Sequence, residues 1–428
     1  PPGGPPRGPP PDEGPPMKAL RFHRKPGRYA AAAVAGRIKA GSGASVGPIS
    51  LRDVDEPTLP TSDWVRLRPR LAGICGSDLA TIDGHSSRYF EPIVSFPFTP
   101  GHEVVGDLED GTRAVLIPVL SCAVRGIEPL CRACADGRTN HCGRLAFGHL
   151  EPGLQSGFCE STGGGWSAEM VAHPSQILPI PEDLSDEAAV MVEPTACAVH
   201  AARQVATHGP LDTVAIIGTG TLGLLTIAAL RHPTGGASIE RIVATGKYPH
   251  QKDLARSLGA DLVVAPGELG RVVRSLTGAW VLGDGADGPA TGSDGQLTDG
   301  VDLVVDCVGT AQSLSQALSV VAPGGEVLVV GMPGHTSLDL TSLWHRETAI
   351  RGCYAYSRSD FEAAVSVVAD ADLARLVSAT YPLSRYRDAI EHAATAGPRG
   401  AVKVAFDLRT APRPTAVNPD AASTKDTI

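Results

Sequence analysis

The chain has 428 residues, of which 42 % are hydrophobic and 19 % charged, so its length and composition suit two globular domains. Its formal net charge is −9, and the sequence contains neither a long basic tract nor a bilayer-length apolar run. These properties argue against a nucleic-acid-binding or membrane-spanning protein.

Both ends of the chain are rich in proline and polar residues. Residues 1–16, "PPGGPPRGPPPDEGPP", lack the apolar core of a signal peptide and are predicted to be a disordered leader, with Met17 as a candidate natural start. Residues 409–428 are predicted to be a disordered tail. Nine cysteines without a signal peptide favour the reducing cytoplasm, where clustered cysteines are more often metal ligands than disulfides.

The first half of the ordered chain is predicted to be an irregular, mostly β domain. In "DWVRLRPRLAGIC" (63–75), Val65, Leu67 and Leu71 alternate with polar positions, as in a half-buried strand. Short apolar runs such as "RAVLIPVL" (113–120) follow between segments rich in glycine and proline. The alternation predicts strands, and the glycines and prolines predict irregular connections between them.

Residue types suited to a catalytic metal occur in three turn-like segments. "GICGSDLA" holds Cys75, "TPGHEVVG" holds His102 and Glu103, and "MVEPTACAVHA" holds Glu193. Thiolate, imidazole and carboxylate are the ligands of catalytic zinc, although each residue alone has a structural explanation. Pro194 disfavours helical backbone at Glu193 and suits the first turn of the helix that follows, so Glu193 is expected at a helix entrance.

A second metal site is indicated by "CRACADGRTNHC", in which Cys131, Cys134 and Cys142 have the spacing C-x2-C-x7-C. A closed zinc site needs four ligands, so this spacing leaves the fourth ligand open. A degenerate loop without metal is the alternative.

Beyond about residue 195, short apolar runs alternate with helical patterns. The predicted strands are "TVAIIG" (213–218), "RIVATG" (241–246), "DLVVA" (261–265), "VDLVVDCVG" (301–309) and "GEVLVVG" (325–331). The predicted helices are "TLGLLTIAALRH" (221–232), "KDLARSLGA" (252–260), "AQSLSQALSVVA" (311–322) and "DFEAAVSVVADADLARLV" (360–377). This alternation predicts a parallel sheet covered by helices on both faces. Residues 284–300 are predicted to be a flexible loop insertion, and "GAVKVAFDL" (400–408) a final strand that returns to the first domain.

A dinucleotide site is indicated by "GTGTLG", which places Gly218, Gly220 and Gly223 at G-x-G-x-x-G, with Leu222 before the last glycine. The motif follows a predicted strand and opens a predicted helix, which is the context that makes it meaningful. The glycines permit the turn, let backbone approach the pyrophosphate and let the helix pack on the strand. A tight turn without ligand is the alternative.

The end of the next strand predicts NADP(H) rather than NAD(H). An acidic residue about 20 positions further on would bind the ribose hydroxyls of NAD. The sequence instead has Gly246 and Lys247, with His250 and Lys252 nearby. Without a carboxylate to repel it, a 2′-phosphate can be attracted by the lysines; an ordinary solvated Lys247 is the alternative.

Taken in this order, the motifs resemble those of the zinc-dependent medium-chain alcohol dehydrogenase superfamily, above all its polyol, glucose and threonine dehydrogenase branch. The resemblance runs from about Met17 to Leu408 and includes "GICGSD", "PGHEVVG", the cysteine segment, "VEPTACAVHAA", "GTGTLG" and "GAVKVAFDL". It implies an α/β protein with a GroES-like, mostly β catalytic domain and a Rossmann cofactor domain. The boundaries expected are 17–195 and 350–408 for the first domain and 196–349 for the second. The resemblance also implies a homo-oligomer, either a dimer or a tetramer.

The resemblance assigns roles to the residues of the catalytic site. Cys75 and His102 match the catalytic zinc ligands, and Glu193 stands where alcohol dehydrogenases have a second cysteine and binds zinc directly or through water. Glu103 can also approach the metal. Asp78 matches the carboxylate that orients the ligand histidine, and Ser77 the hydroxyl that begins the proton relay.

The resemblance also bears on the fourth ligand of the cysteine segment. The family pattern is C-x2-C-x2-C-x7-C, and Glu128 occupies the position three before Cys131. A carboxylate can bind zinc, so Glu128 is the expected fourth ligand of a structural zinc. Cys122 is the alternative, and it would require the "AVRGIEPL" segment to fold back.

The predicted function is the reversible oxidation of a secondary alcohol, such as a polyol, sugar or amino alcohol, with zinc and NADP(H). Two other readings are a zinc-independent enoyl or quinone reductase of the same superfamily and a non-catalytic nucleotide-binding protein. The first would not need Cys75, His102 and Glu193, and the second would be expected to lose a ligand or a glycine. No nucleic-acid or membrane partner is expected.

Overall fold

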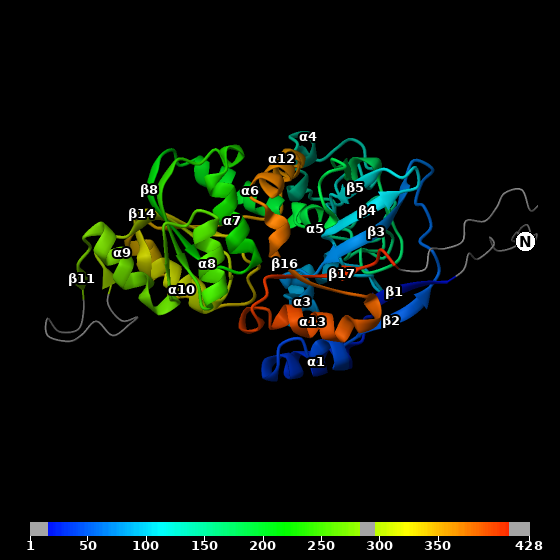
Figure 1. Cartoon of the computed structure of the whole chain (residues 1–428), viewed down its shortest axis with the longest axis horizontal. Helices are drawn as coiled ribbons and strands as arrows, with labels where there is room; N and C mark the ends of the chain where they lie inside the picture. Colours follow the sequence, from blue (N-terminus) through cyan, green and yellow to red (C-terminus); the bar gives the residue numbers. More distant parts are fainter. Residues whose placement is uncertain (1–15, 283–295, 411–428) are drawn as a thin grey trace, which may run out of the picture.

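The computed structural model describes residues 16–282 and 296–410. Most of the predicted leader (1–16), of the predicted tail (409–428) and of the insertion at 284–300 lies outside the described residues. Two large sheets lie at opposite ends of the long axis, with helices between them and around them (Figure 1). No helix of the described ranges is both long and apolar enough to cross a bilayer.

The first sheet is mostly antiparallel and has seven strands in the order β16-β17-β3-β4-β5-β7, with β6 also paired to β3. Its centre is β3 (Val65–Gly73), which confirms the predicted strand at 63–75. The predicted C-terminal strand is β17 (Lys403–Asp407), and it pairs antiparallel with β3. Through this pairing the chain returns to the first sheet.

The second sheet has six parallel strands in the order β10-β9-β8-β13-β14-β15. Numbered from β8, this order is 3-2-1-4-5-6, which is the strand order of the doubly wound dinucleotide fold. The reversal of strand order lies between β8 (Leu211–Ile217) and β13 (Val301–Asp306). The last strand, β15 (Ala349–Gly352), straddles the domain boundary expected at residue 349.

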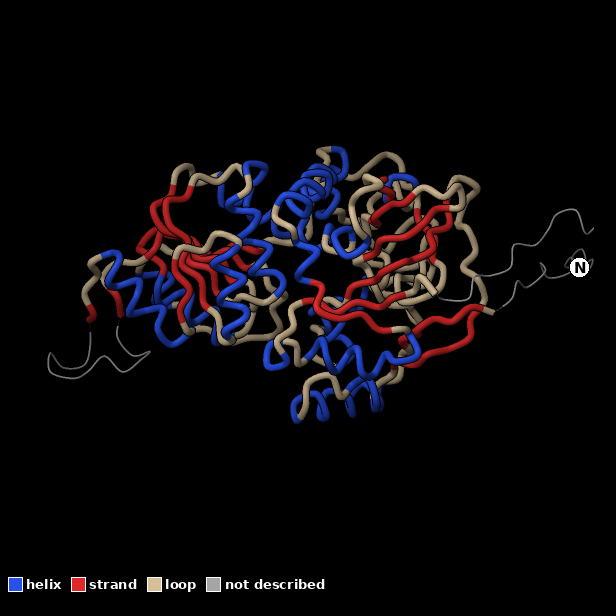
Figure 2. The backbone as a smooth tube through the Cα atoms, viewed as in Figure 1, coloured by secondary structure: helices blue, strands red, loops and turns tan. Residues whose placement is uncertain are grey.

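Helices α6 (Val192–Ala206) and α12 (Arg358–Asp370) pack against each other between the two sheets (Figures 1 and 2). Buried apolar residues of α6, such as Val199, belong to one continuous core with Leu71 of the first sheet and Val214 of the second. This shared core explains how a site between the sheets can hold its geometry. The predicted helix at 360–377 is shorter than expected, because the chain leaves α12 at Ala371 and Asp372 adopts a left-handed backbone (φ 49°).

The first domain contains more helix than its sequence predicted. The connection between β1 (Met17–Phe22) and β2 (Ile49–Val54) holds α1 (Pro26–Ile38) and α2 (Gly43–Val46). Proline at the start and the alanines that follow favour helix in this segment, although its apolar periodicity is weak. In Figure 1, α1 lies beside α13 at the lower edge of the molecule.

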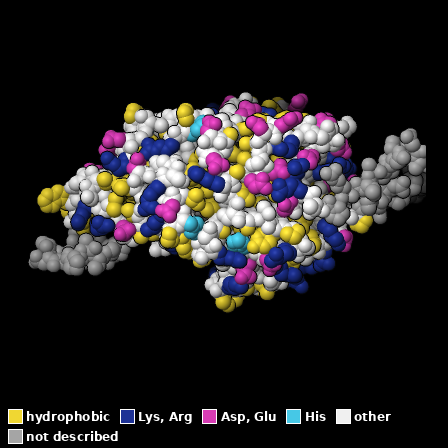
Figure 3. Space-filling model, in the orientation of Figure 1, with side chains coloured by type: hydrophobic (Ala, Val, Ile, Leu, Met, Phe, Trp, Pro, Cys, Tyr) yellow, Lys and Arg dark blue, Asp and Glu magenta, His cyan; other side chains and the backbone are white. Residues whose placement is uncertain are grey.

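The remaining α-helices and strands belong to the two large sheets, surround them or form a small separate sheet. They are α3 (Gly76–Ile82), β4 (Val104–Leu108), β5 (Arg113–Leu116), α4 (Arg132–Ala135), β6 (Met170–Ala172), β7 (Ile177–Pro179), α5 (Asp186–Ala189), α7 (Thr221–Arg231), β9 (Ile239–Thr245), α8 (Pro249–Ser257), β10 (Leu262–Val264), α9 (Leu269–Thr277), β11 (Val281–Leu282), β12 (Gln296–Leu297), α10 (Ala311–Val320), β14 (Val321–Val329), α11 (Thr341–His345), β16 (Val377–Tyr381) and α13 (Tyr386–Ala394). Acidic and basic side chains are interspersed over the face seen in Figure 3.

Candidate active site and metal clusters

Cys75 lies in the turn that joins β3 to α3. It is the N-cap of α3, and its backbone N–H donates a hydrogen bond to Asp78 Oδ2 at 3.0 Å. This contact satisfies one of the free N–H groups at the helix start. The Asp78 carboxylate thus holds the turn that carries the Cys75 thiol.

His102 and Glu103 lie immediately before β4 and directly after Gly101, which has a positive φ angle. Gly101 has φ +99°, and a Cβ built on it would lie 2.4 Å from Trp166 Cδ1. Only glycine fits this turn against the buried Trp166 ring. The "PGHE" segment therefore carries its two side chains out of a turn that the tertiary structure defines.

The structure brings Cys75, His102 and Glu103 together. One ligand atom from each lies within 4.8 Å of the others, and the histidine and the glutamate are buried. Asp78 Oδ1 lies 3.6 Å from His102 Nδ1, beyond hydrogen-bond distance, and both buried atoms lack a hydrogen-bond partner. A thiolate, an imidazole and a carboxylate with unsatisfied buried atoms fit a zinc ion.

Glu193 lines the same cavity but is not part of this group of ligand atoms. Helix α6 begins at Val192, so Glu193 lies within its first turn, contrary to the expectation that Pro194 would keep Glu193 out of helical backbone. Position N3 tolerates proline, because the N–H groups of the first helical turn have no partner within the helix. Tyr356 Oη–H donates a 2.7 Å hydrogen bond to Glu193 Oε1, and burial raises the pKa of Glu193 to about 7.

A buried ion pair completes the surroundings of the cluster, and sequence reasoning missed it. Lys403 of β17 donates to the Glu103 carboxylate and to the Ile74 carbonyl oxygen, the latter at 3.3 Å. Burial opposes the charge of Lys403, yet the Glu103 carboxylate raises the pKa of the lysine above its ordinary value. A single lysine inside the apolar run "GAVKVAFDL" was the available signal, since a buried lysine needs a partner.

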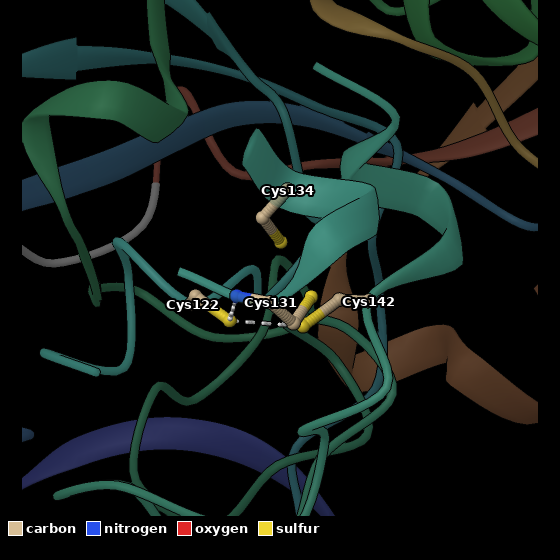
Figure 4. A group of neighbouring side chains, drawn as sticks. All are labelled: Cys122, Cys131, Cys134 and Cys142. Atoms are coloured by element: carbon tan, nitrogen blue, oxygen red, sulfur yellow. Dashed lines mark hydrogen bonds between the residues drawn. The ribbon is translucent and has the colours of Figure 1, made fainter. Parts of the chain in front are cut away.

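The cysteine segment forms a second group, which we call the cysteine lobe: Cys122, Cys131, Cys134 and Cys142. Figure 4 shows the four side chains turned toward one another, and their sulfur atoms all lie within 4.8 Å of one another. The Cys122 and Cys142 sulfurs are 3.7 Å apart. Tetrahedral zinc with bonds of about 2.3 Å would separate its sulfurs by about 3.8 Å, so the four thiols fit this ion.

The structure does not bring Glu128, the preferred fourth ligand, to the three predicted cysteine ligands. Glu128 is exposed and outside the group, and the alternative, Cys122, takes the position. The intervening segment does fold back, since Ile127 N–H donates to the Cys122 carbonyl oxygen at 3.0 Å. The fully buried Arg125 holds this turn by donating to carbonyl oxygens between Phe147 and Gly153. Spacing along the chain did not reveal this turn.

The G-x-G-x-x-G segment forms the turn between β8 and α7. Gly218 has φ +92°, and a Cβ there would lie 2.4 Å from Val308 Cγ2. A Cβ on Gly223 would lie 1.8 Å from the Gly218 carbonyl oxygen, which shows how closely α7 approaches the turn. Gly220 is the N-cap of α7, and a Cβ there would meet nothing within 4 Å. The turn is open at the helix N-terminus, where a pyrophosphate is favoured.

Gly246 and Lys247 follow the end of β9, close to this turn. A Cβ on Gly246 would lie 2.7 Å from Thr219 Oγ1 and 3.0 Å from Lys252 Cγ. Lys247 is exposed, and Lys252 is half-buried with its stem against Gly246. Position 246 therefore has little room for an acidic side chain, whereas Lys247 and Lys252 lie next to it.

One cavity of about 1420 Å³ connects the G-x-G-x-x-G turn at 218–223, here called the nucleotide turn, with Cys75, His102 and Glu103, here called the metal group. Cys75, Ser77, His102, Glu103 and Glu193 line it, as do Gly220 and Leu222. The cavity lies at the carboxyl ends of β8 and β13, where open α/β sheets bind their ligands. The metal group and the nucleotide turn thus line the same cavity.

Comparisons with known proteins agree with this architecture. Residues 61–182 match the alcohol dehydrogenase GroES-like domain, and residues 221–370 match the zinc-binding dehydrogenase family. The chain is 30 % identical to a sorbitol dehydrogenase of Arabidopsis thaliana over 69 % of this chain and 74 % of that protein. It is 29 % identical to an L-idonate 5-dehydrogenase of Vitis vinifera, over 82 % and 90 %. A zinc-binding dehydrogenase from Sinorhizobium meliloti, solved with NADP, superposes with a TM-score of 0.65 at 25 % identity, covering 92 % of this chain and 99 % of the other.

The GroES-like and Rossmann arrangement, the turn of glycines at the nucleotide position and these matches all agree with the resemblance seen in the sequence. The chain is an oxidoreductase that acts on CH–OH groups. It belongs to the zinc-dependent medium-chain alcohol dehydrogenase superfamily, in the branch of the polyol dehydrogenases.

Proposed function

We propose that this chain oxidises a secondary alcohol to a ketone with NADP⁺, and reduces the ketone with NADPH, at the cavity between its two sheets. The observation that carries the proposal is that Cys75, His102 and Glu103 converge in the same cavity as the glycine turn. The balanced reaction is alcohol plus NADP⁺ to ketone, NADPH and a proton.

The metal ligands are proposed to be Cys75 and His102, with Glu103 and Glu193 able to approach the ion. When bound, zinc lowers the pKa of the alcohol oxygen and the nicotinamide accepts the hydride. Asp78 holds the Cys75 turn and faces His102, so it acts as a positioning residue for both ligands. Lys403 holds the Glu103 carboxylate away from solvent.

Ser77 is proposed to receive the proton of the alcohol. It lines the cavity one residue before Asp78, and it is half-buried. Thr81 Oγ1–H donates to the Ser77 carbonyl oxygen at 2.8 Å, and Thr81 Oγ1 lies 2.8 Å from Ser86 Oγ. The contact to Ser77 is made by its backbone oxygen, so the proton is proposed to pass from the Ser77 hydroxyl to solvent in the cavity, which Thr81 and Ser86 also line.

The proposed preference for NADP(H) rests on Gly246 and on the two lysines beside it. Gly218, Gly220 and Gly223 would hold the pyrophosphate, with Leu222 against the cofactor. Lys247 and Lys252 would attract the 2′-phosphate, and no acidic side chain at Gly246 repels it. An aspartate at 246 would press on Thr219, so removing the lysines tests the preference more cleanly than Gly246→Asp.

The cysteine lobe is proposed to hold a structural zinc with Cys122, Cys131, Cys134 and Cys142 as its four ligands. Four protein ligands leave no position for substrate. The backbone N–H groups of Cys134 and Gly143 lower the pKa of Cys131 to about 6, which favours the thiolate that binds metal.

We further propose that the protein is cytoplasmic and forms a homo-oligomer, a dimer or a tetramer. All nine cysteines are free thiols, as a reducing compartment maintains them. The edge strand β15 has all four residues exposed, and Trp344 before it is 78 % exposed. An exposed edge with apolar residues favours pairing between copies, which light scattering on the eluted protein would measure.

The experiment for the proposed function combines metal analysis, cofactor binding and turnover. The purified protein should contain two zinc ions per chain and should enhance NADPH fluorescence. It should oxidise members of a panel of secondary alcohols, including polyols, sugars and amino alcohols, with NADP⁺ or NAD⁺. Zinc-free protein that turns over enones instead would support a zinc-independent reductase, and cofactor binding without any turnover would support a non-catalytic protein.

A further inference from the structure

A continuous row of aromatic rings runs away from the metal group. The Phe158 ring lies 5.9 Å from the His102 ring, and the Phe98 ring lies 5.3 Å from Phe158. Beyond Phe98, the rings of Phe22 and Phe96 follow at 5.1 and 5.4 Å. Phe22, Phe98 and Phe158 are buried, whereas Phe96 remains partly exposed. All four phenylalanines line the cavity.

The cavity wall around this row is also apolar. Tyr29 of α1, Leu79 of α3, Phe90, Val94 and Leu154 all line it and are only half-buried. The chain has only 8 phenylalanines, and 5 of them line this one cavity: Phe22, Phe90, Phe96, Phe98 and Phe158. Half-buried apolar side chains around a cavity gain free energy when an apolar group displaces the water beside them.

Some polar groups in the same part of the cavity pair with one another. The Thr81 hydroxyl contacts both the Ser77 carbonyl oxygen and the Ser86 hydroxyl, each at 2.8 Å. At the mouth, the charges of Arg24 and Glu91 pair at 3.0 Å. A polyhydroxylated chain laid along the phenylalanine row would bring its hydroxyls against apolar side chains, and a hydroxyl that loses its water without a new partner costs free energy.

We propose that the preferred substrate is a secondary alcohol, or its ketone, that carries an alkyl or aryl substituent lying along the Phe158–Phe96 row. The inference rests on the proposed function, because it takes the reacting carbon to be at the metal group. It narrows the substrate class within that function to one with an apolar body rather than a polyol chain. Tyr29, which α1 supplies from the connection between β1 and β2, also lines the cavity, with its ring 6.4 Å from that of Phe22.

The first test uses the wild-type zinc-containing protein with NADP⁺ and a graded series of alcohols. We expect kcat/KM to rise from 2-butanol to 2-hexanol to 2-octanol by roughly threefold per added methylene, as burial in an apolar wall predicts. We also expect 1-phenylethanol to exceed sorbitol and xylitol by at least about tenfold in kcat/KM.

The outcomes separate this inference from the proposed function. If polyols are oxidised at least as well as 2-octanol and 1-phenylethanol, or if kcat/KM does not rise with chain length, the inference is overturned and the proposed function stands. If no alcohol of either class is oxidised with either cofactor, the proposed function fails and the inference fails with it.

The second test assigns the preference to the aromatic row. Phe96→Ser should lower kcat/KM for 2-octanol about tenfold, mainly through KM, while kcat/KM for 2-butanol changes less than about threefold. Phe90→Ser provides a second variant of the same wall, should Phe96→Ser fail to fold. The matched control is Phe147→Ser, which removes a phenylalanine that is 65 % exposed and outside this cavity. Equal losses for 2-octanol and 2-butanol in a folded variant would contradict a role in recognising the substituent.

Discussion

The two groups of candidate zinc ligands in this chain share thiol ligands but are built in opposite ways. The cysteine lobe takes all four of its cysteines from residues 122–142 and packs with Ile127 and Leu145 as a small core of its own. The proposed catalytic cluster takes Cys75 from one turn and His102 with Glu103 from another, and it borders a cavity of about 1420 Å³. A closed set of four thiolates stabilises a fold, whereas an open set leaves a coordination position for substrate. The same ion would therefore support folding at one site and chemistry at the other.

Removing a ligand of the catalytic cluster should have the largest effect on activity. Cys75→Ser and His102→Ala should each lower turnover by on the order of 10³-fold or more, because the alcohol oxygen loses its Lewis acid. Steady-state kinetics with NADP⁺ measure this loss. NADPH fluorescence should be unchanged, since the glycine turn lies in the other sheet. Full turnover in either variant, with its catalytic zinc absent by metal analysis, would contradict the mechanism.

Removing a ligand of the cysteine lobe should change stability more than chemistry. Cys122→Ser should lose one zinc per chain and lower the melting temperature by about 5 °C, because a structural zinc binds only the folded chain. Metal analysis and calorimetry give the two readouts. Turnover per folded, catalytic-zinc-containing chain should be retained.

Glu128→Ala is the matched control for the cysteine lobe. Glu128 is exposed and outside the group, so this variant should keep both zinc ions and its melting temperature. Loss of zinc in Glu128→Ala but not in Cys122→Ser would show that the glutamate closes the site after all.

The catalytic cluster should also depend on its buried ion pair, which the cysteine lobe lacks. Lys403→Met leaves the Glu103 carboxylate buried without its partner and should lower the free energy of unfolding by about 3 kcal/mol. Denaturant unfolding measures the loss. The double variant Glu103→Gln/Lys403→Met should recover part of it, because no unpaired charge remains. A double variant less stable than Lys403→Met would contradict this coupling.

The smallest effect, a change in kcat/KM for the cofactor, is expected from the two lysines near the nucleotide turn, away from both clusters. Lys247→Ala combined with Lys252→Ala should lower kcat/KM for NADP⁺ about tenfold, since charge-assisted contacts to the 2′-phosphate would be lost. The kcat/KM for NAD⁺ and the zinc content should not change. Lys25→Ala, a change of the same kind at an exposed lysine in the mouth of the cavity, is the control for altered net charge. Wild-type protein that prefers NAD⁺ would contradict the predicted preference for NADP(H).

The sequence alone determined the features that depend on local patterns. Alternating apolar residues at 63–75 predicted β3, and glycines with a strand before them and a helix after them predicted the β8–α7 turn. Both rest on interactions between near neighbours, namely side-chain alternation across a strand and the steric freedom of glycine. The types of the catalytic ligands were also readable, because thiolate, imidazole and carboxylate carry their chemistry wherever they lie.

Only the tertiary structure decided the features that join distant segments. Cys122, and not Glu128, lies beside the other three cysteines because buried Arg125 turns the chain back by donating to carbonyl oxygens between Phe147 and Gly153, outside the cysteine spacing. Lys403 meets Glu103 because β17 pairs with β3 across most of the chain's length. The row from Phe158 to Phe96 gathers rings whose order along the chain gives no period. Such contacts depend on how sheets and loops pack, and packing selects partners by shape and burial rather than by separation in sequence.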